Sequence, residues 1–156
     1  MLARGQIILY ADSSSLPGVI IARGSGSKWT HCAVALGDGT AIQCEATHGG
    51  VCVLPEGSGD PSTVIPYTGY VEKFIANMEA CGAQAQMRHA PDRYDYFGLF
   101  ANPFWNMFGW DIGLRKSSWN CATFLAQAMP PKVLAQRKKP LAAWSPGDFV
   151  GLDYNA

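Results

Sequence analysis

Residues 30–46 read Thr-His-Cys-Ala-Val-Ala-Leu-Gly-Asp-Gly-Thr-Ala-Ile-Gln-Cys-Glu-Ala, and this stretch decides the fold class. Two mostly apolar runs flank the tripeptide Gly37-Asp38-Gly39, which is a pattern typical of a β-hairpin. Shorter runs of strand-forming residues lie at 5–10, 51–54 and 63–65, and a proline follows each of the last two. The sequence therefore predicts a small antiparallel sheet in the first part of the chain.

The spacing of apolar residues changes after this region. From Val71 to Cys81 they recur at helical intervals, with Gly82 as a candidate stop, although residues 84–89 are able to continue the helix. A second helix is predicted over 121–129, because cap-forming residues precede it and two prolines follow it. Strands followed by helices favour one α+β domain over residues 1–156, in which a small antiparallel sheet packs against helices.

Three segments carry weaker signals. Residues 13–18 are typical of a turn, and residues 23–27, rich in glycine and serine, predict a flexible loop. The segment 96–110 holds seven of the eighteen aromatic residues and is expected to form a loop or short broken helices that fill the core. Residues 140–149 are expected to be irregular, with a turn at 145–148.

Composition and charge exclude several classes of protein. Of the 156 residues, 48% are hydrophobic and 15% are charged, which is incompatible with disorder. The twelve basic and twelve acidic side chains cancel, so nucleic acid is not expected as the main partner. The only basic cluster is short and is expected to be a solvated face; its members are Lys132, Arg137, Lys138 and Lys139.

No transmembrane anchor is expected from the sequence. The longest uncharged aromatic-rich run, 96–110, contains Pro103 and is shorter than the roughly 20 residues of a membrane span. The apolar stretch Ile7–Ala11 is too short for a signal peptide. The location is therefore unknown, with the cytoplasm as the default and a released or virion-associated protein as the alternative.

Cys121 is the most informative of the five cysteines. It is predicted in the first turn of a helix, where unpaired backbone N–H groups and the helix dipole stabilise a thiolate. The alternative is an inert, buried cysteine. Cys32, Cys44 and Cys52 lie in strand patterns and Cys81 lies on an apolar helix face, so these four are expected to be inert. No C-x-x-C pair is present, and reduced thiols are expected.

His31 is the best candidate for the base that a cysteine nucleophile needs. It opens an apolar strand beside the glycine-rich loop, whereas His48 lies in a turn and His89 near a helix end. Strand alternation places His31, Ala33 and Ala35 on one face, and the small alanines leave room there for another element, such as a helix N-terminus. A purely structural histidine is the alternative.

A catalytic imidazole needs an acceptor that orients it. The hairpin brings residues 43–45 alongside 31–33, and Gln43 and Glu45 share a face, so both are candidates; a half-solvated strand face is the alternative. A zinc site formed by His31, Cys44, His48 and Cys52 is an alternative interpretation. It is disfavoured because Cys44 points away from Gln43 and Glu45 and the spacings match no common motif, so neither a metal nor a cofactor is expected.

With these residues assembled, the chain resembles the circularly permuted papain-like cysteine hydrolases, which are relatives of the NlpC-type cell-wall peptidases and of lecithin:retinol acyltransferase. The resembling segments occur in the order of the family; they are Gly5–Leu9, Trp29–Gly39, Glu45–Val51, Tyr94–Gly98, Trp119–Ala126 and Ser145–Phe149. One departure is Ala122-Thr123, where many relatives have Ser-Glu.

The resemblance implies a permuted papain-like (NlpC-type) architecture with Cys121 as nucleophile and His31 as base. The backbone N–H of Cys121 would contribute to an oxyanion hole. For the third polar residue, the usual distance from the histidine points to Gln43, whereas the local Glu-Ala…Gly-Val pattern points to Glu45.

The leading functional hypothesis is a cysteine hydrolase that cleaves an amide bond, with a cell-wall (peptidoglycan) peptide as the expected substrate. Such a domain would meet cell wall after lysis or as a subunit of a larger assembly such as a phage particle. The first alternative is a lipid or thioester acyl hydrolase or acyltransferase, which the aromatic run 96–110 would serve. The second alternative is a non-catalytic structural module of an assembly.

Overall fold

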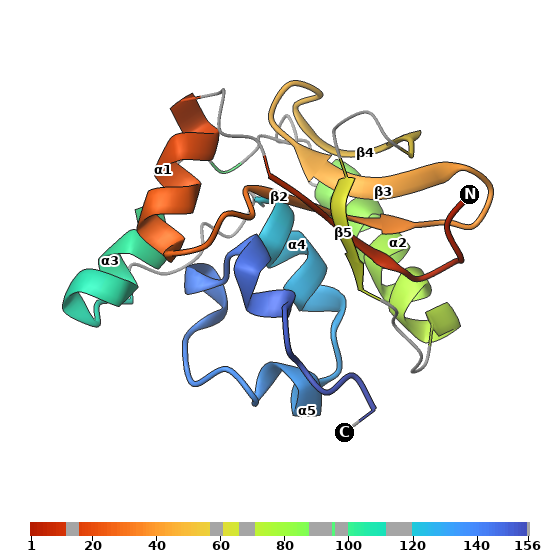
Figure 1. The fold of residues 1–156 in the computed structure, drawn as a ribbon. Coiled ribbons are helices and arrows are strands. Elements are labelled where there is room, and N and C mark those ends of the chain that lie inside the picture. Colours follow the sequence, from red (N-terminus) through yellow and green to blue (C-terminus); the bar gives the residue numbers. More distant parts are fainter. Residues whose placement is uncertain are drawn as a thin grey trace.

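The computed structural model describes residues 1–11, 16–56, 61–65, 71–87, 95, 100–111 and 120–155 (Figure 1). Its centre is a five-stranded sheet of order β4-β3-β2-β1-β5, in which all neighbouring strands are antiparallel. The strands are β1 (Ile7–Tyr10), β2 (His31–Ala35), β3 (Thr40–Glu45), β4 (Gly50–Pro55) and β5 (Pro61–Ile65). The predicted α+β class with an antiparallel sheet is confirmed.

The β2–β3 hairpin forms where the sequence predicts it. Gly37 and Gly39 both have positive φ, at 86° and 87°, which residues with a side chain rarely adopt. Asp38 Oδ1 accepts the Thr40 N–H at 2.9 Å and closes the turn. The resulting register places Ala33 opposite Gln43, so this turn fixes which β3 side chains lie near the start of β2.

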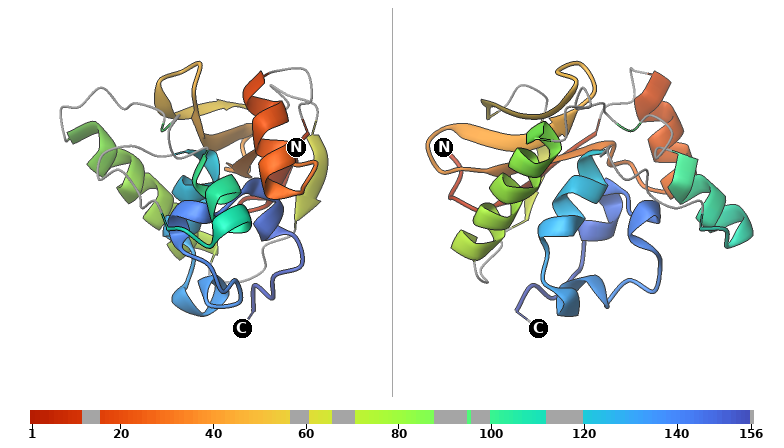
Figure 2. Two further views of the ribbon diagram at one scale, coloured as in Figure 1. Left: turned by 90° about the vertical axis from the view of Figure 1, so that its left-hand side faces the viewer. Right: turned by 180° about the vertical axis from the view of Figure 1, so that it is seen from behind.

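The helices form two groups beside the sheet, α2 with α4 and α1 with α3 (Figures 1 and 2). They are α1 (Leu16–Ser25), α2 (Val71–Met87), α3 (Ala101–Phe108), α4 (Cys121–Ala128) and α5 (Pro131–Leu134), with 3₁₀ turns η2 (Leu141–Ala143) and η3 (Pro146–Phe149). Helix α4 packs on β2 and β3, and α2 packs against α4. Helices α1 and α3 lie side by side, away from α2.

Alternation along the strands separates two clusters of buried residues. The larger cluster lies between the sheet and helices α2 and α4, and it includes Val34, Phe74 and Phe124. The smaller cluster lies on the opposite sheet face and includes Ala33 and Ala35. Helix α4 is not the element that fills the room beside these alanines, because it packs on the opposite face. The alanines pack instead with β1 side chains of the smaller cluster.

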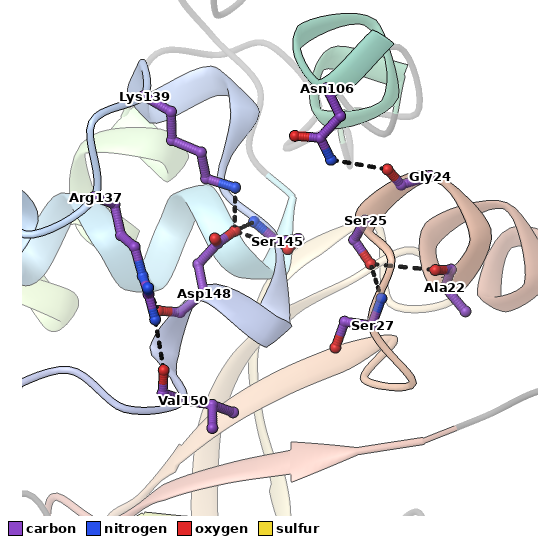
Figure 3. A network of polar contacts seen from close by, with 10 residues as sticks. All are labelled: Ala22, Gly24, Ser25, Ser27, Asn106, Arg137, Lys139, Ser145, Asp148 and Val150. Carbon is purple, nitrogen blue, oxygen red and sulfur yellow. Dashed lines mark hydrogen bonds and ion pairs between the residues drawn. The ribbon is translucent and has the colours of Figure 1, made fainter.

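The loop predicted over residues 23–27 is wrong over 23–25, because α1 runs to Ser25, whereas residues 26 and 27 do leave the helix in a turn. The turn predicted over 13–18 is wrong from Leu16 onward, and residues 13–15 lie outside the described part. Gly24 explains the error. A Cβ atom there would lie 2.1 Å from Pro103 Cγ of α3, and Asn106 Nδ2 donates to the Gly24 carbonyl at 3.0 Å (Figure 3). Gly24 is thus a helix–helix contact residue rather than a loop residue.

Two other helices also differ from expectation. Helix α2 does not stop at Gly82 but continues to Met87, as the second sequence prediction allows. Within the aromatic segment, Ala101–Phe108 forms α3, while residues 96–99 lie outside the described part. The expectation that these aromatics fill the core is wrong for Phe108 and Trp110, which are 53% and 61% exposed.

Arg137 and Lys139, which the sequence predicts on a solvated face, instead hold the C-terminal turn in place (Figure 3). Asp148 Oδ2 accepts hydrogen bonds from the Ser145 N–H and Oγ–H, both at 2.7 Å, and pairs with Lys139 Nζ at 2.5 Å. Arg137 donates to the Asp148 and Val150 carbonyls. The solvated-face expectation is therefore wrong for Arg137 and Lys139, whereas Lys132 and Lys138 are exposed.

Across the ranges given above, none of the helices combines the length and the apolar character that crossing a membrane requires.

Candidate active site

Cys121 is the first residue of α4, as the sequence predicts. Asn120 is the N-cap, and its side chain accepts the Thr123 N–H at 2.9 Å while Thr123 Oγ1 accepts the Asn120 N–H at 3.0 Å. This reciprocal capping box satisfies two backbone donors and fixes the start of the helix. Thr123 is one of the two positions at which the sequence departs from the resembling family, and here it completes the cap.

The Cys121 side chain lies in a group of polar partners although it is only 2% exposed. The Cys32 side chain, the Cys32 backbone and the His31 imidazole all interact with its sulfur. The Cys32 thiol contributes most, and together with the nearby His31 charge these contacts outweigh burial, so the pKa of Cys121 is held well below its usual range. Of the two thiols, Cys121 is therefore the one that ionises more readily.

Cys32 is the complementary partner in this thiol pair. Burial raises the pKa of Cys32 well above its usual range, and the hydrogen bond to Cys121 raises it further. Cys32 thus keeps its proton and donates it in a hydrogen bond to the Cys121 sulfur. Sequence reasoning treated Cys32 as an inert strand residue. The overlooked signal is alternation, because Cys32 faces the side of the sheet on which α4 packs.

His31 opens β2 and links Cys121 to the sheet. Its Nε2 lies 2.7 Å from Gln43 Oε1, and because an amide oxygen only accepts hydrogen bonds, Nε2 is the donor. Burial alone would lower the pKa of His31, but the Cys121 thiolate and the hydrogen bonds to Cys121 and Gln43 raise it overall. The Tyr10 ring packs 5.7 Å from the imidazole, centroid to centroid, and helps to hold it in place.

The two candidates for the third polar residue have different surroundings. Gln43 is buried and bonds His31 directly. Glu45 is half-buried, and its Oε2 instead pairs with His48 Nδ1 at 2.8 Å; it acts on His31 only through its charge, which helps to raise the pKa of His31. The structure thus brings Cys121, His31 and Gln43 together and leaves Glu45 one step away. His89 lies outside the described residues.

A pocket of about 220 Å³ lies far from this group. It opens between α2 and the turn after α4, where Phe74, Met129 and Pro130 are among its walls. Met129 and Pro130 follow the C-terminal end of α4, whereas Cys121 lies at its N-terminal end, and an eight-residue helix is about 12 Å long. This pocket is therefore separate from the candidate site.

Comparison with known proteins adds no assignment: no family model matches the chain, and no curated protein matches it. The functional argument therefore rests on the geometry of the residues themselves.

Proposed function

We propose that the protein is a cysteine hydrolase in which Cys121 is the nucleophile, His31 the general acid and base, and Gln43 the residue that orients the imidazole. The observation that carries the proposal is the continuous chain of contacts from Cys121 to His31 to Gln43. Nucleophile, base and orienting group in hydrogen-bonding sequence are the recurring arrangement of covalent catalysis.

The tautomer of His31 suits this role. Because Nε2–H is donated to Gln43 Oε1, Nδ1 is the ring nitrogen that remains to interact with the Cys121 sulfur. With Cys121 ionised, Nδ1 carries the proton that the leaving group will need. A lowered pKa for Cys121 and a raised pKa for His31 favour this thiolate–imidazolium pair in the resting enzyme.

The reaction follows from these protonation states. The Cys121 thiolate attacks the carbonyl carbon of an amide, and the negative charge that develops on oxygen is stabilised by the backbone N–H of Cys121 at the α4 N-terminus. His31 gives its Nδ1 proton to the leaving amine as the C–N bond breaks. Neutral His31 then takes a proton from water, which attacks the thioester, releases the acid and restores the thiolate.

The resemblance to permuted papain-like hydrolases agrees with the arrangement of the site. A strand histidine precedes a helix-N-terminal cysteine in the chain, and an amide side chain from the neighbouring strand meets the histidine. On this basis we assign the permuted, NlpC-type architecture. We also take an amide bond in a cell-wall peptide as the leading substrate, presented after lysis or by an assembly such as a phage particle.

The test uses the full-length chain and defined peptidoglycan stem peptides, with products read by liquid chromatography and mass spectrometry. Cleavage at one amide bond is expected for the wild type and for Cys81→Ala, a control at a half-buried cysteine away from the site. Cys121→Ala is expected to be inactive. Turnover by Cys121→Ala equal to that of the wild type would refute the nucleophile, and absence of cleavage in the wild type would refute the substrate class.

One observation favours a second candidate, an acyl hydrolase or acyltransferase acting on lipids or thioesters. At the end of α3, Met107, Phe108 and Trp110 are all more than half exposed, and the rings of Phe108 and Trp110 lie 5.0 Å apart. An exposed apolar group of this kind is suited to an acyl chain or a lipid surface. Hydrolysis of acyl thioesters or phospholipids that depends on Cys121, without cleavage of peptides, would select this candidate. Absence of both activities, with no reactive thiol, would favour a structural module.

A further inference from the structure

Three side chains near the β3–β4 turn bring different metal-binding atoms together. A carboxylate oxygen of Glu45, an imidazole nitrogen of His48 and the sulfur of Cys52 all lie within 4.8 Å of one another. The tightest contact is 2.8 Å, between His48 Nδ1 and Glu45 Oε2. This set differs from the zinc set weighed from the sequence, because Cys44 is buried in the core and His31 is bonded to Gln43.

The strand register produces this convergence. Cys52 lies opposite Gln43, and Glu45 lies opposite Gly50, so Cys52 and Glu45 are diagonal neighbours on one face of the hairpin. Gly50 has no side chain to occupy the space opposite Glu45. Gly49, with a φ of 78°, helps the chain to reverse before β4. His48 can therefore lie over the hairpin and complete the group.

The donor types match one metal ion better than others. Zn²⁺ binds carboxylate oxygen, imidazole nitrogen and thiolate sulfur at about 2.0–2.3 Å in a tetrahedral arrangement, which puts ligand atoms about 3.4 Å apart. Side-chain movements of about 1 Å would bring the three atoms to these separations. Ca²⁺ and Mg²⁺ need six or more oxygen ligands, which this group does not offer.

We propose that Glu45, His48 and Cys52 form a Zn²⁺ site with three protein ligands and a fourth position open to water. Glu45 and Cys52 are half-buried and His48 is exposed, so an ion can enter from solvent. The bound ion links the turn to β4, next to the position of Gln43 in β3. The site uses none of the residues of the proposed catalytic group, so it stands or falls separately from the proposed function.

The test is a metal titration of the full-length protein. Cys121→Ala is used as the parent, so that the Cys121 thiol contributes neither metal binding nor a charge-transfer band of its own. Calorimetry with Zn²⁺ is expected to give one equivalent of binding. Titration with Co²⁺ as a spectroscopic probe is expected to give a thiolate-to-cobalt charge-transfer band together with the strong visible bands of a tetrahedral ion.

Added to this parent, His48→Ala and Cys52→Ala are each expected to weaken Zn²⁺ binding more than about tenfold, and Cys52→Ala to abolish the charge-transfer band. Cys81→Ala, at another half-buried cysteine, is the matched control and is expected to bind as the parent does. Circular dichroism checks that each variant is folded, and Glu45→Gln provides a third ligand change of nearly unchanged shape. Lack of stoichiometric binding, or binding that survives both His48→Ala and Cys52→Ala, would overturn the proposal.

Discussion

Replacing Cys32 by alanine isolates the contribution of the second thiol to the reactivity of Cys121. The Cys32 side chain is the largest cause of the lowered pKa of Cys121. A hydrogen bond to a charged group contributes about 1.5–3 kcal/mol, and a thiol is a weak donor, so the lower end, about 1.5 kcal/mol, applies. That energy corresponds to about a tenfold smaller thiolate fraction at a pH where Cys121 is only partly ionised.

The assay is the rate of Cys121 alkylation by iodoacetamide as a function of pH, read by peptide mass spectrometry. Labelling in Cys32→Ala is expected to be about tenfold slower on the acidic side and to converge with the wild type at high pH, where the thiol is ionised in both. Cys32→Ser keeps a donor and is expected to restore most of the rate. Cys44→Ala removes another buried sulfur from the same core and controls for packing. Equal rates in Cys32→Ala and wild type, or equal slowing in Cys44→Ala, would refute the reasoning.

Three further changes test other parts of the structure. Gln43→Ala removes a hydrogen bond to the charged imidazole and is expected to lower kcat about ten- to a hundredfold with little change in KM. Glu45→Gln is expected to lower kcat less. A larger loss of kcat in Glu45→Gln than in Gln43→Ala, measured by steady-state kinetics, would assign the orienting role to Glu45. Asp148→Ala leaves a largely buried lysine without its partner and is expected to lower the free energy of unfolding by about 3–5 kcal/mol; denaturant unfolding that shows less than about 1 kcal/mol would contradict the buried ion pair. Gly24→Ala introduces a Cβ atom 2.1 Å from Pro103 Cγ and is expected to lower the free energy of unfolding by about 1–3 kcal/mol in the same assay. The double variant Gly24→Ala/Pro103→Ala is expected to recover part of this loss. If the effects of the two substitutions simply add, the contact is not the cause.

Local sequence patterns were sufficient to predict much of the sheet and helix α4. The β2–β3 hairpin depends on two glycines and alternating apolar residues, which are visible in the sequence. Helix α4 depends on its cap and on the prolines that follow it. Helix α1 was missed because Gly24 has the propensity of a helix breaker. A side chain at position 24 would collide with Pro103, which lies far away in the chain, and no local sequence pattern reveals this contact.

The residues of the candidate site were likewise predictable only in part. Cys121 and His31 were selected from their predicted positions at a helix start and a strand start. The choice between Gln43 and Glu45 stayed open because both lie on one strand face, and only the register and the position of His48 separate them. Cys32 was missed because its partner comes from a helix about 90 residues later, and strand propensity carries no information about that contact.

The pairing of Cys121 with His31 is tested most directly by the pH dependence of Cys121 alkylation in the wild type and in His31→Ala. In the wild type, Cys121 is expected to react rapidly well below pH 8.5, the usual pKa of a free thiol being about 8.5. Its acid limb would follow the lowered pKa of Cys121. Loss of the imidazolium in His31→Ala raises the pKa of Cys121, so labelling at neutral pH is expected to slow. A Cys121 that reacts no faster than Cys81 at neutral pH, or whose rate is unchanged in His31→Ala, would contradict the proposed active site.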